Sequence, residues 1–281
     1  MAIERIEEIG LRADQIRRRD ISKWQSGRAS SHAEDLAVEE PLEIRLGGRR
    51  FTLTMRTPGH DEELAAGFLF AEGFIDQASE LGEIRRVRGR KGELEPNAID
   101  VILNVPAERL RVRLKRNFVM SSSCGVCGKT SIDSIRRRVE SPVDSAAVTS
   151  AVLLTLASKL REGQRIFAAT GGLHGAAIFG LNGTMVVIRE DVGRHNAVDK
   201  VIGYALTNAM VPLSRHLMMV SGRLSFEIVQ KAAAAGIPIL AAVSAPSSLA
   251  VELAETIGTT LVGFLRDGSF NIYTRPDRIS G

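Results

Sequence analysis

Cysteine is scarce in this chain: the 281 residues include only Cys124 and Cys127, and both lie in one short stretch. A secreted disulfide scaffold would need a larger, even set of cysteines spread along the chain, so that class is excluded. One close pair indicates redox, metal or sulfur chemistry in a reducing compartment instead. Because the first 20 residues are charged throughout and contain no apolar run, we expect a cytoplasmic protein.

Aromatic residues and long apolar runs are also lacking. Aromatics make up 5% of the chain, whereas proteins that stack on nucleic-acid bases usually depend on them. No stretch approaches the roughly 20 consecutive apolar residues that span a bilayer. The net charge of +4 is only mildly basic, which allows an anionic ligand without requiring nucleic acid. We therefore expect neither nucleic acid nor a membrane as a partner.

The pattern of apolar residues predicts an α/β protein in three parts. Residues 1–35 are typical of a mobile or loosely helical tail, residues 36–140 of a smaller strand-rich part ending in the cysteine loop, and residues 141–281 of an α/β core. Alternation of strands and helices in the core is typical of a layered sheet. The smaller part is expected to hold strands at 36–46, 50–56, 98–105 and 109–116 and a helix from Asp61. The core is expected to hold strands at 185–189, 216–220, 237–243 and 260–265 and helices at 145–160, 194–208, 225–235 and 247–257.

The segment SSSCGVCGK, residues 121–129, carries the clearest chemical signal. A cysteine acts as a nucleophile in its thiolate form, and glycine backbone N–H groups together with Lys129 favour that form. A structural zinc site usually needs four ligands, so histidines would have to complete one, and we expect none. A dithiol oxidoreductase is an alternative, although thioredoxin-like pairs lie early in a βαβ unit. A zinc deaminase would use His32 and Glu34 as its H-x-E motif, but Ser123 stands where that pattern has proline.

Polar residues also follow several expected core strands. His174 lies in TGGLHGAA (170–177), Arg194 and His195 in REDVGRHNAVDK (189–200), and Arg223 in SGRLS (221–225). Ligands of α/β sheets gather at the carboxyl ends of strands, so these loops suit a pocket for a phosphate-bearing ligand. The alternative is structural: a tight turn into a buried helix at His174, and a pair between His195 and Asp191.

Basic residues alternate along the expected strand 109–116. This spacing would put four of them on one face, as a basic surface for a polyanion or as an ordinary solvated face: Arg109, Arg111, Arg113 and Lys115.

Taken together, these motifs resemble the formate dehydrogenase accessory sulfurtransferases, the FdhD/NarQ family. The resemblance rests on five segments in order and covers nearly everything from about Val38 to the C-terminus: 121–129, 170–177, 189–200, 221–233 and 260–274. It implies a cytidine-deaminase-like layered core without the deaminase zinc chemistry, and a homodimer. It also implies that a cysteine desulfurase donates sulfur and that formate dehydrogenase receives the product.

The resemblance assigns roles residue by residue. Cys124 matches the persulfide-bearing cysteine and Cys127 the auxiliary one. The cargo would be molybdenum bis(molybdopterin guanine dinucleotide), with a guanine nucleotide as its mimic. Its expected binding segment is Phe264, Leu265, Arg266, Asp267, Gly268 and Ser269, and further pocket candidates are His174, Arg194, His195 and Arg223. A cofactor chaperone without covalent sulfur chemistry, or a dithiol oxidoreductase, remains an alternative.

Overall fold

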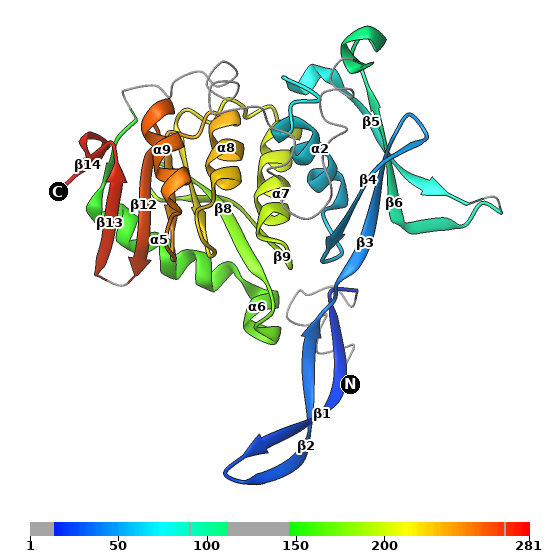
Figure 1. The fold of residues 1–281 in the computed structure, drawn as a ribbon, viewed down its shortest axis with the longest axis horizontal. Coiled ribbons are helices and arrows are strands. Elements are labelled where there is room, and N and C mark those ends of the chain that lie inside the picture. Colours follow the sequence, from blue (N-terminus) through cyan, green and yellow to red (C-terminus); the bar gives the residue numbers. More distant parts are fainter. Residues whose placement is uncertain (1–13, 90, 112–145, 267) are drawn as a thin grey trace.

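The computed structural model describes residues 14–89, 91–111, 146–266 and 268–281 (Figure 1). Cys124 and Cys127 lie outside these residues, as do Asp267, Arg113 and Lys115. The strands are β1 Ile16–Gln25, β2 Arg28–Ala37, β3 Glu40–Leu46, β4 Arg49–Arg56, β5 Leu81–Arg88, β6 Leu94–Leu103, β7 Val148–Thr149, β8 His174–Gly180, β9 Met185–Asp191, β10 His216–Val220, β11 Ile239–Ala242, β12 Thr260–Arg266, β13 Ser269–Thr274 and β14 Ile279–Ser280. The main helices are α2 Asp61–Ala71, α5 Ser150–Gly163, α6 Arg165–Thr170, α7 Arg194–Thr207, α8 Phe226–Ala234 and α9 Ser248–Ile257.

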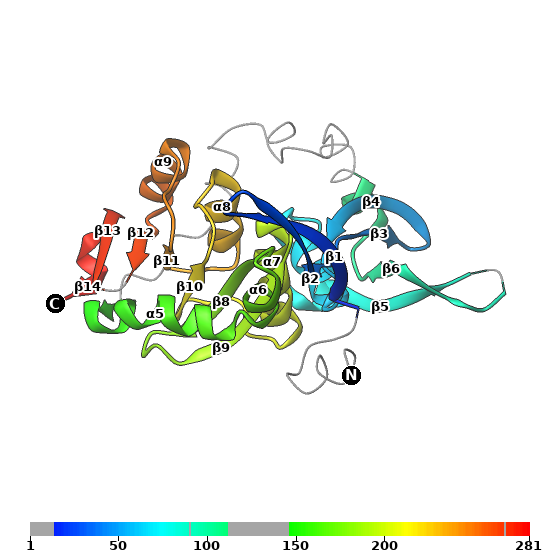
Figure 2. The same cartoon turned by 90° about the horizontal axis from the view of Figure 1, so that it is seen from below.

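A six-stranded sheet with the order β13-β12-β11-β10-β8-β9 organises the C-terminal part. Strands β10, β11 and β12 are parallel, and β8 is antiparallel to both β10 and β9, so β9 runs in the direction of β10. Helices α7, α8 and α9 cover one face, and α5 covers the other (Figure 2). The expected α/β class is confirmed, and the expected core strands and helices recur within a few residues, except that α5 begins at Ser150.

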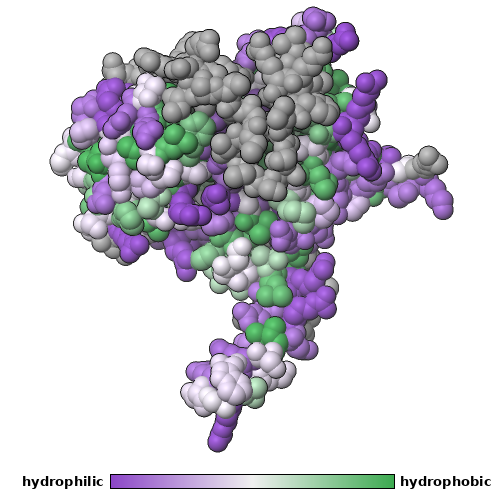
Figure 3. Space-filling view, viewed as in Figure 1, coloured by the Kyte–Doolittle hydropathy of each residue, from purple (hydrophilic) through white to green (hydrophobic). Residues whose placement is uncertain are grey.

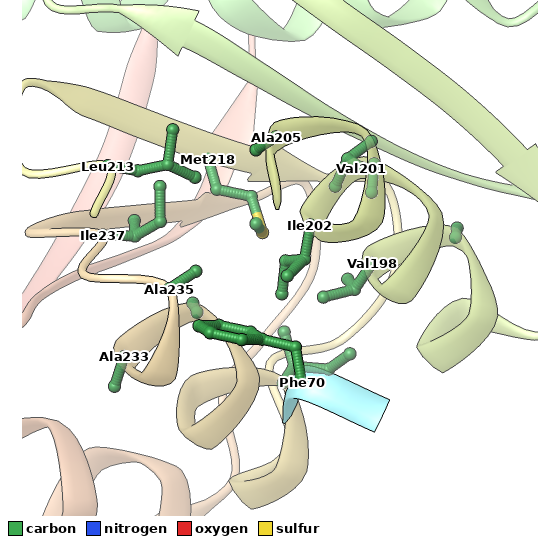
Figure 4. Packing of buried hydrophobic residues seen from close by; sticks show 14 of the residues in the cluster. Phe70, Val198, Val201, Ile202, Ala205, Leu213, Met218, Ala233, Ala235 and Ile237 are labelled. Carbon is green, nitrogen blue, oxygen red and sulfur yellow. The ribbon is translucent and has the colours of Figure 1, made fainter. Parts of the chain in front are cut away.

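The two faces of the sheet are buried because apolar residues occupy both sides of its strands. In β8, Ala176 and Ile178 point to the helices α7–α9, whereas Ala177 and Phe179 pack with α5. This strand replaces the helix that we considered after the Gly-Gly turn, since small and β-branched residues fit a strand buried on both faces. Side chains from separate elements pack together between the sheet and these helices, among them Ile202 of α7 and Met218 of β10 (Figure 4).

The N-terminal part is a four-stranded sheet, β4-β3-β6-β5, with α2 against it. Helix α2 also packs on α7, and two glycines allow a very close approach. A Cβ added at Gly67 would lie 1.8 Å from the carbonyl oxygen of Asp199, and one at Gly203 would lie 1.8 Å from that of Glu63. Apolar residues of α2 and α7 belong to one cluster, so the two parts share a continuous core.

Residues 16–37 correct one expectation. Where the sequence indicated a tail, β1 and β2 form a regular antiparallel hairpin, the arm, which projects from the body (Figure 1). Ser26 and Gly27 at its tip have φ of 51° and 79°, as a two-residue turn with positive φ requires. The expected strand 36–46 is therefore divided between β2 and β3.

The basic strand expected at 109–116 is wrong where the structure describes it. Residues 107–111 are helical, so Arg109 and Arg111 do not alternate on a strand face. Arg109 reaches Asp76 and Glu80 instead, and these ion pairs secure the segment after β6 to the loop before β5. Local charge spacing could not reveal these partners, which lie about 30 residues away in sequence.

Candidate functional site

The candidate site lies along the edge of the six-stranded sheet where the four parallel strands end. The loops after β9, β10, β11 and β12 all open at this edge, and His174 joins them because β8 begins there. We call this surface the strand-end edge. Its position agrees with the general rule that ligands of α/β sheets bind at the carboxyl ends of strands.

Backbone hydrogen bonds join neighbouring loops into a continuous surface. The Ser221 N–H donates to the Gly175 carbonyl oxygen at 2.9 Å, and the Gly175 N–H donates to the Ser221 hydroxyl at 2.9 Å. Farther along, Leu224 donates to the carbonyl oxygen of Ala245 at 3.1 Å, and Phe264 to that of Ser244 at 3.1 Å. Adjacent strands are about 4.8 Å apart, so the edge extends about 14 Å from β8 to β12, enough for an extended ligand.

Three basic side chains influence His174. A Cβ added at Gly222 would lie 3.4 Å from His174 Nδ1 and 3.7 Å from Arg194 Cβ, so these groups surround a glycine. Burial lowers the pKa of His174, and the electrostatic effects of Arg194, His195 and Arg223 lower it further, against the opposing effect of Asp191. The structure thus brings together all four expected pocket residues, and His174 is neutral at neutral pH.

Glu227 is a site residue that sequence reasoning missed. Its Oε2 lies 3.2 Å from His195 Nε2, and the hydroxyl of Ser225 is 3.3 Å from the same ring nitrogen and 3.1 Å from Oε2. The bond from His195 is the main cause of the lowered pKa of Glu227. Its position two residues after Ser225, in the first turn of α8, was the available signal. The proposed pair between His195 and Asp191 is replaced by this one.

Two arginines at the edge are available to an anion. Arg194 is half-buried and Arg223 is exposed, and within the described ranges neither forms an ion pair. Arg194 Nε is buried without a hydrogen-bond partner. A guanidinium that is not neutralised locally attracts carboxylate or phosphate groups, and the open first turn of α7 adds N–H donors of the same sign.

Other polar residues of the 189–200 segment are structural. Asp191 is fully buried and pairs with Lys200 at 2.7 Å, while the Lys200 ammonium also donates to the Thr57 carbonyl oxygen at 2.9 Å. Asn196 donates to the Met55 carbonyl oxygen at 2.7 Å. Glu190 accepts hydrogen bonds from the first N–H groups of α6. These contacts attach β4 to the base of α7 and α6 to the end of β9, leaving Arg194 and His195 to face the edge.

The expected cargo segment, 264–269, forms the hairpin between β12 and β13. Phe264 is 38% exposed with φ of 52°, Arg266 is exposed, and Arg266 pairs with Ser269 across the turn that contains Gly268. Leu265 is fully buried in the core beneath α5, so its side chain does not face the edge. The segment lies at one end of the strand-end edge, and His174 and His195 lie at the other end.

Neither a metal cluster nor a membrane span is found in the described part of the chain. No group of three or more His, Cys, Asp or Glu side chains there could hold a metal ion. None of the helices in those ranges has the length and apolar character needed to cross a bilayer. His32, considered above for a deaminase-type zinc site, lies exposed on the arm opposite Ile21.

Comparisons with known proteins identify the family. The FdhD/NarQ family model matches residues 37–280. A protein of Mycolicibacterium paratuberculosis named sulfur carrier protein FdhD is 53% identical over 266 residues, covering 93% of this chain and 98% of its own. A protein of the same name from Sulfolobus acidocaldarius is 44% identical, covering 94% and 99%.

A solved structure is also similar. It comes from Desulfotalea psychrophila, is assigned as a formate dehydrogenase accessory protein, and matches with a TM-score of 0.74 and 28% identity over 95% of this chain and all of its own. The range matched by the family model, residues 37–280, includes every strand of both larger sheets and the whole strand-end edge. On these grounds the chain belongs to the FdhD/NarQ family.

Proposed function

We propose that this protein is a sulfur carrier that binds the molybdenum cofactor of a formate dehydrogenase and supplies it with sulfur. The observation that carries this proposal is the pair of arginines, Arg194 and Arg223, that form no ion pair within the described ranges and lie on an edge long enough for a dinucleotide. The name of the relatives, sulfur carrier protein, supports the sulfur chemistry. The assignment of the solved neighbour as a formate dehydrogenase accessory protein supports the recipient.

The cargo would be molybdenum bis(molybdopterin guanine dinucleotide), bound as substrate. Its phosphates would lie against Arg194 and Arg223, and the hairpin of residues 264–269 would hold a guanine at the other end. Neutral His174 offers one hydrogen-bond donor and one acceptor, and the His195–Glu227 pair orients an imidazole toward the same anion. Interactions at both ends would fix the position of the metal, which is how a carrier lowers the entropy cost of transfer.

Cys124 would carry the sulfur. Its thiolate attacks the outer sulfur of a persulfide on a cysteine desulfurase, a new S–S bond forms, and the thiolate of the desulfurase leaves. The outer sulfur then passes to molybdenum as sulfide, Cys124 returns as a thiolate, and the reduced metal of the cargo supplies the two electrons. Cys127 would act as an auxiliary thiol. We further propose that the protein is a cytoplasmic homodimer with a cytidine-deaminase-like layered core.

Binding of the cargo can be tested with GDP. We expect Arg194→Gln/Arg223→Gln to weaken the calorimetric affinity for GDP by about tenfold or more, because two charge-assisted contacts are lost. The matched control is Arg86→Gln/Lys91→Gln, which also removes two positive charges, at exposed residues of the β5–β6 hairpin. Equal affinity in both variants would contradict a phosphate site at the strand-end edge.

Sulfur transfer needs a separate experiment. After incubation with a cysteine desulfurase and cysteine, intact-mass analysis should show one added sulfur on Cys124 that a reductant removes. Purified Cys124→Ala protein should bind GDP normally. In cells that carry only this variant, formate dehydrogenase should be inactive. An active dehydrogenase in those cells would favour a chaperone without covalent chemistry. Reduction of a disulfide substrate that needs both cysteines would favour a dithiol oxidoreductase.

A further inference from the structure

The arm, β1 and β2, is the largest feature that the proposed chemistry does not use. Ten residue pairs in uninterrupted register join its strands, and its base packs against α6 and the start of β8. Ile16 packs there with Ile166 and Leu173, and the Gln15 side chain donates to the Pro58 carbonyl oxygen at 2.9 Å. Beyond this base, nearly all side chains are exposed, and among the described strands β1 and β2 pair only with each other. A two-stranded hairpin alone is marginally stable in water, so burial against a partner would favour the arm.

The two faces of the arm differ in charge. Residues directly opposite each other share a face, so the register defines both. One face holds four basic residues and one acidic residue: Arg17, Arg19, Lys23, Arg28 and Glu34. The other holds Arg18, Asp20 and Asp35 among small or apolar residues. Within the described ranges Arg19, Lys23 and Arg28 form no ion pair, so their charge is available to a partner.

Trp24 at the tip adds an anchor. It is 73% exposed, the highest value among the large apolar residues that face solvent in the described chain. Tryptophan and arginine dominate the energetically important positions of protein interfaces. Figure 3 shows the arm below the body with hydrophilic residues mixed with pale and green ones, unlike a uniformly basic surface. The arm combines this exposed aromatic side chain with charges of both signs, a composition that favours a protein partner over a polyphosphate backbone.

The place of attachment indicates which protein. Leu173 and Val192 pack at the base of the arm. Leu173 directly precedes His174, and Val192 lies two residues before Arg194. Both His174 and Arg194 belong to the strand-end edge. In Figure 1 the arm extends on the side of the sheet where the parallel strands end. A protein that binds the arm would therefore lie next to the bound cargo. The protein that accepts the cargo must reach this position.

We infer that the arm is a docking element that inserts into a groove of the apo-formate dehydrogenase, with its basic face against an acidic wall and Trp24, which lies on the other face of the hairpin, against the opposite wall. This inference rests on the proposed function, because the acceptor is defined by the cargo. The arm, with about 20 residues, can supply the 20–30 residues per side of a standard interface. The family model begins at residue 37, where the arm ends, whereas the relative from Mycolicibacterium paratuberculosis aligns over 93% of the chain and so includes at least part of the arm.

The experiment measures binding of purified apo-formate dehydrogenase to the full-length protein at two salt concentrations. We expect Lys23→Glu/Arg28→Glu and Trp24→Ala each to weaken binding by about tenfold or more, and binding to weaken with salt. The matched control is Arg86→Glu/Lys91→Glu, which changes the net charge equally on the other projecting hairpin, β5–β6. Arm variants should keep the wild-type melting temperature, GDP affinity and sulfur loading.

Each other outcome overturns the inference. Equal binding by arm variants and control would show that docking uses another surface, while intact GDP affinity and sulfur loading would leave the proposed function standing. If wild-type protein fails to bind the apo-enzyme although formate dehydrogenase activity in cells requires it, the arm has no such role.

Charge-dependent binding of an RNA or DNA oligonucleotide by the arm, without an effect of the arm variants on binding of the apo-enzyme, would indicate a polyanion as the partner. A changed sedimentation coefficient in the arm variants would indicate contact between copies. Loss of GDP binding and sulfur loading in wild type would instead refute the proposed function.

Discussion

Replacing Lys200 by methionine tests the division of the 189–200 segment into structural and ligand-facing residues. Lys200 and Asp191 have side-chain exposures of 1% and 0%, and the ammonium lies 2.7 Å from Asp191 Oδ2. Methionine would keep the volume but leave the carboxylate of Asp191 buried without its counter-charge. The remaining donors to that carboxylate are the N–H groups of Thr57 and Gly193 and the amide of Asn196.

The expected cost is large compared with the stability of the fold. Breaking a buried ion pair by removing one partner costs about 3–5 kcal/mol, against a typical total of about 5–15 kcal/mol. For a chain of this size, the melting temperature should fall by about 5–9 °C. Arg194→Gln, six residues away on the same helix, should cost less than about 0.5 kcal/mol because Arg194 has no ion pair in the described structure.

The assay is urea unfolding followed by far-ultraviolet circular dichroism. Fluorescence is unsuitable because the single tryptophan, Trp24, is exposed on the arm and reports little of the core. GDP affinity, measured below the unfolding transition, should be near wild type for Lys200→Met and reduced for Arg194→Gln. A Lys200→Met protein within 1 kcal/mol of wild type, or equal costs in the two variants, would refute the division.

Two further predictions concern the helix contact and the site histidine. Gly203→Ala should destabilise the protein by about 1–3 kcal/mol in the same urea assay, because the new Cβ would lie 1.8 Å from the Glu63 backbone of the closely packed helix α2. An unchanged urea midpoint would show that α2 can shift to accommodate the new side chain. The pKa of His174 is lowered in the fold, chiefly by burial, so the unfolded chain binds the proton first and stability should fall as pH decreases below about 6.5. His174→Asn should make this decline shallower in pH-dependent thermal unfolding, while His216, whose pKa burial also lowers, contributes equally to both proteins; an equally steep decline would contradict the shift.

Much of the α/β core could be predicted because its signals are local. Strands such as His216–Val220 are short apolar runs bounded by turn residues, and α8 and α9 follow Ser225 and Ser247 at their N-caps. Each element therefore reveals itself within about ten residues. The arm escaped prediction because its strands are charged and solvated on both faces, so neither alternation nor an apolar run marks them. Arg109 was misjudged for a related reason, since its acidic partners lie far away in sequence.

The sequence by itself determined the family motifs, the cysteine pair and the set of loops at the strand ends, because order and spacing along the chain express them. Only the tertiary structure decided which polar residues serve the fold. Asp191 and Lys200 contact the backbone of Thr57, which directly follows β4 and lies more than 130 residues earlier, and Glu227 reaches His195 from a different helix. Burial and long-range pairing set the cost of a charge, and neither quantity is encoded in the local spacing of residues.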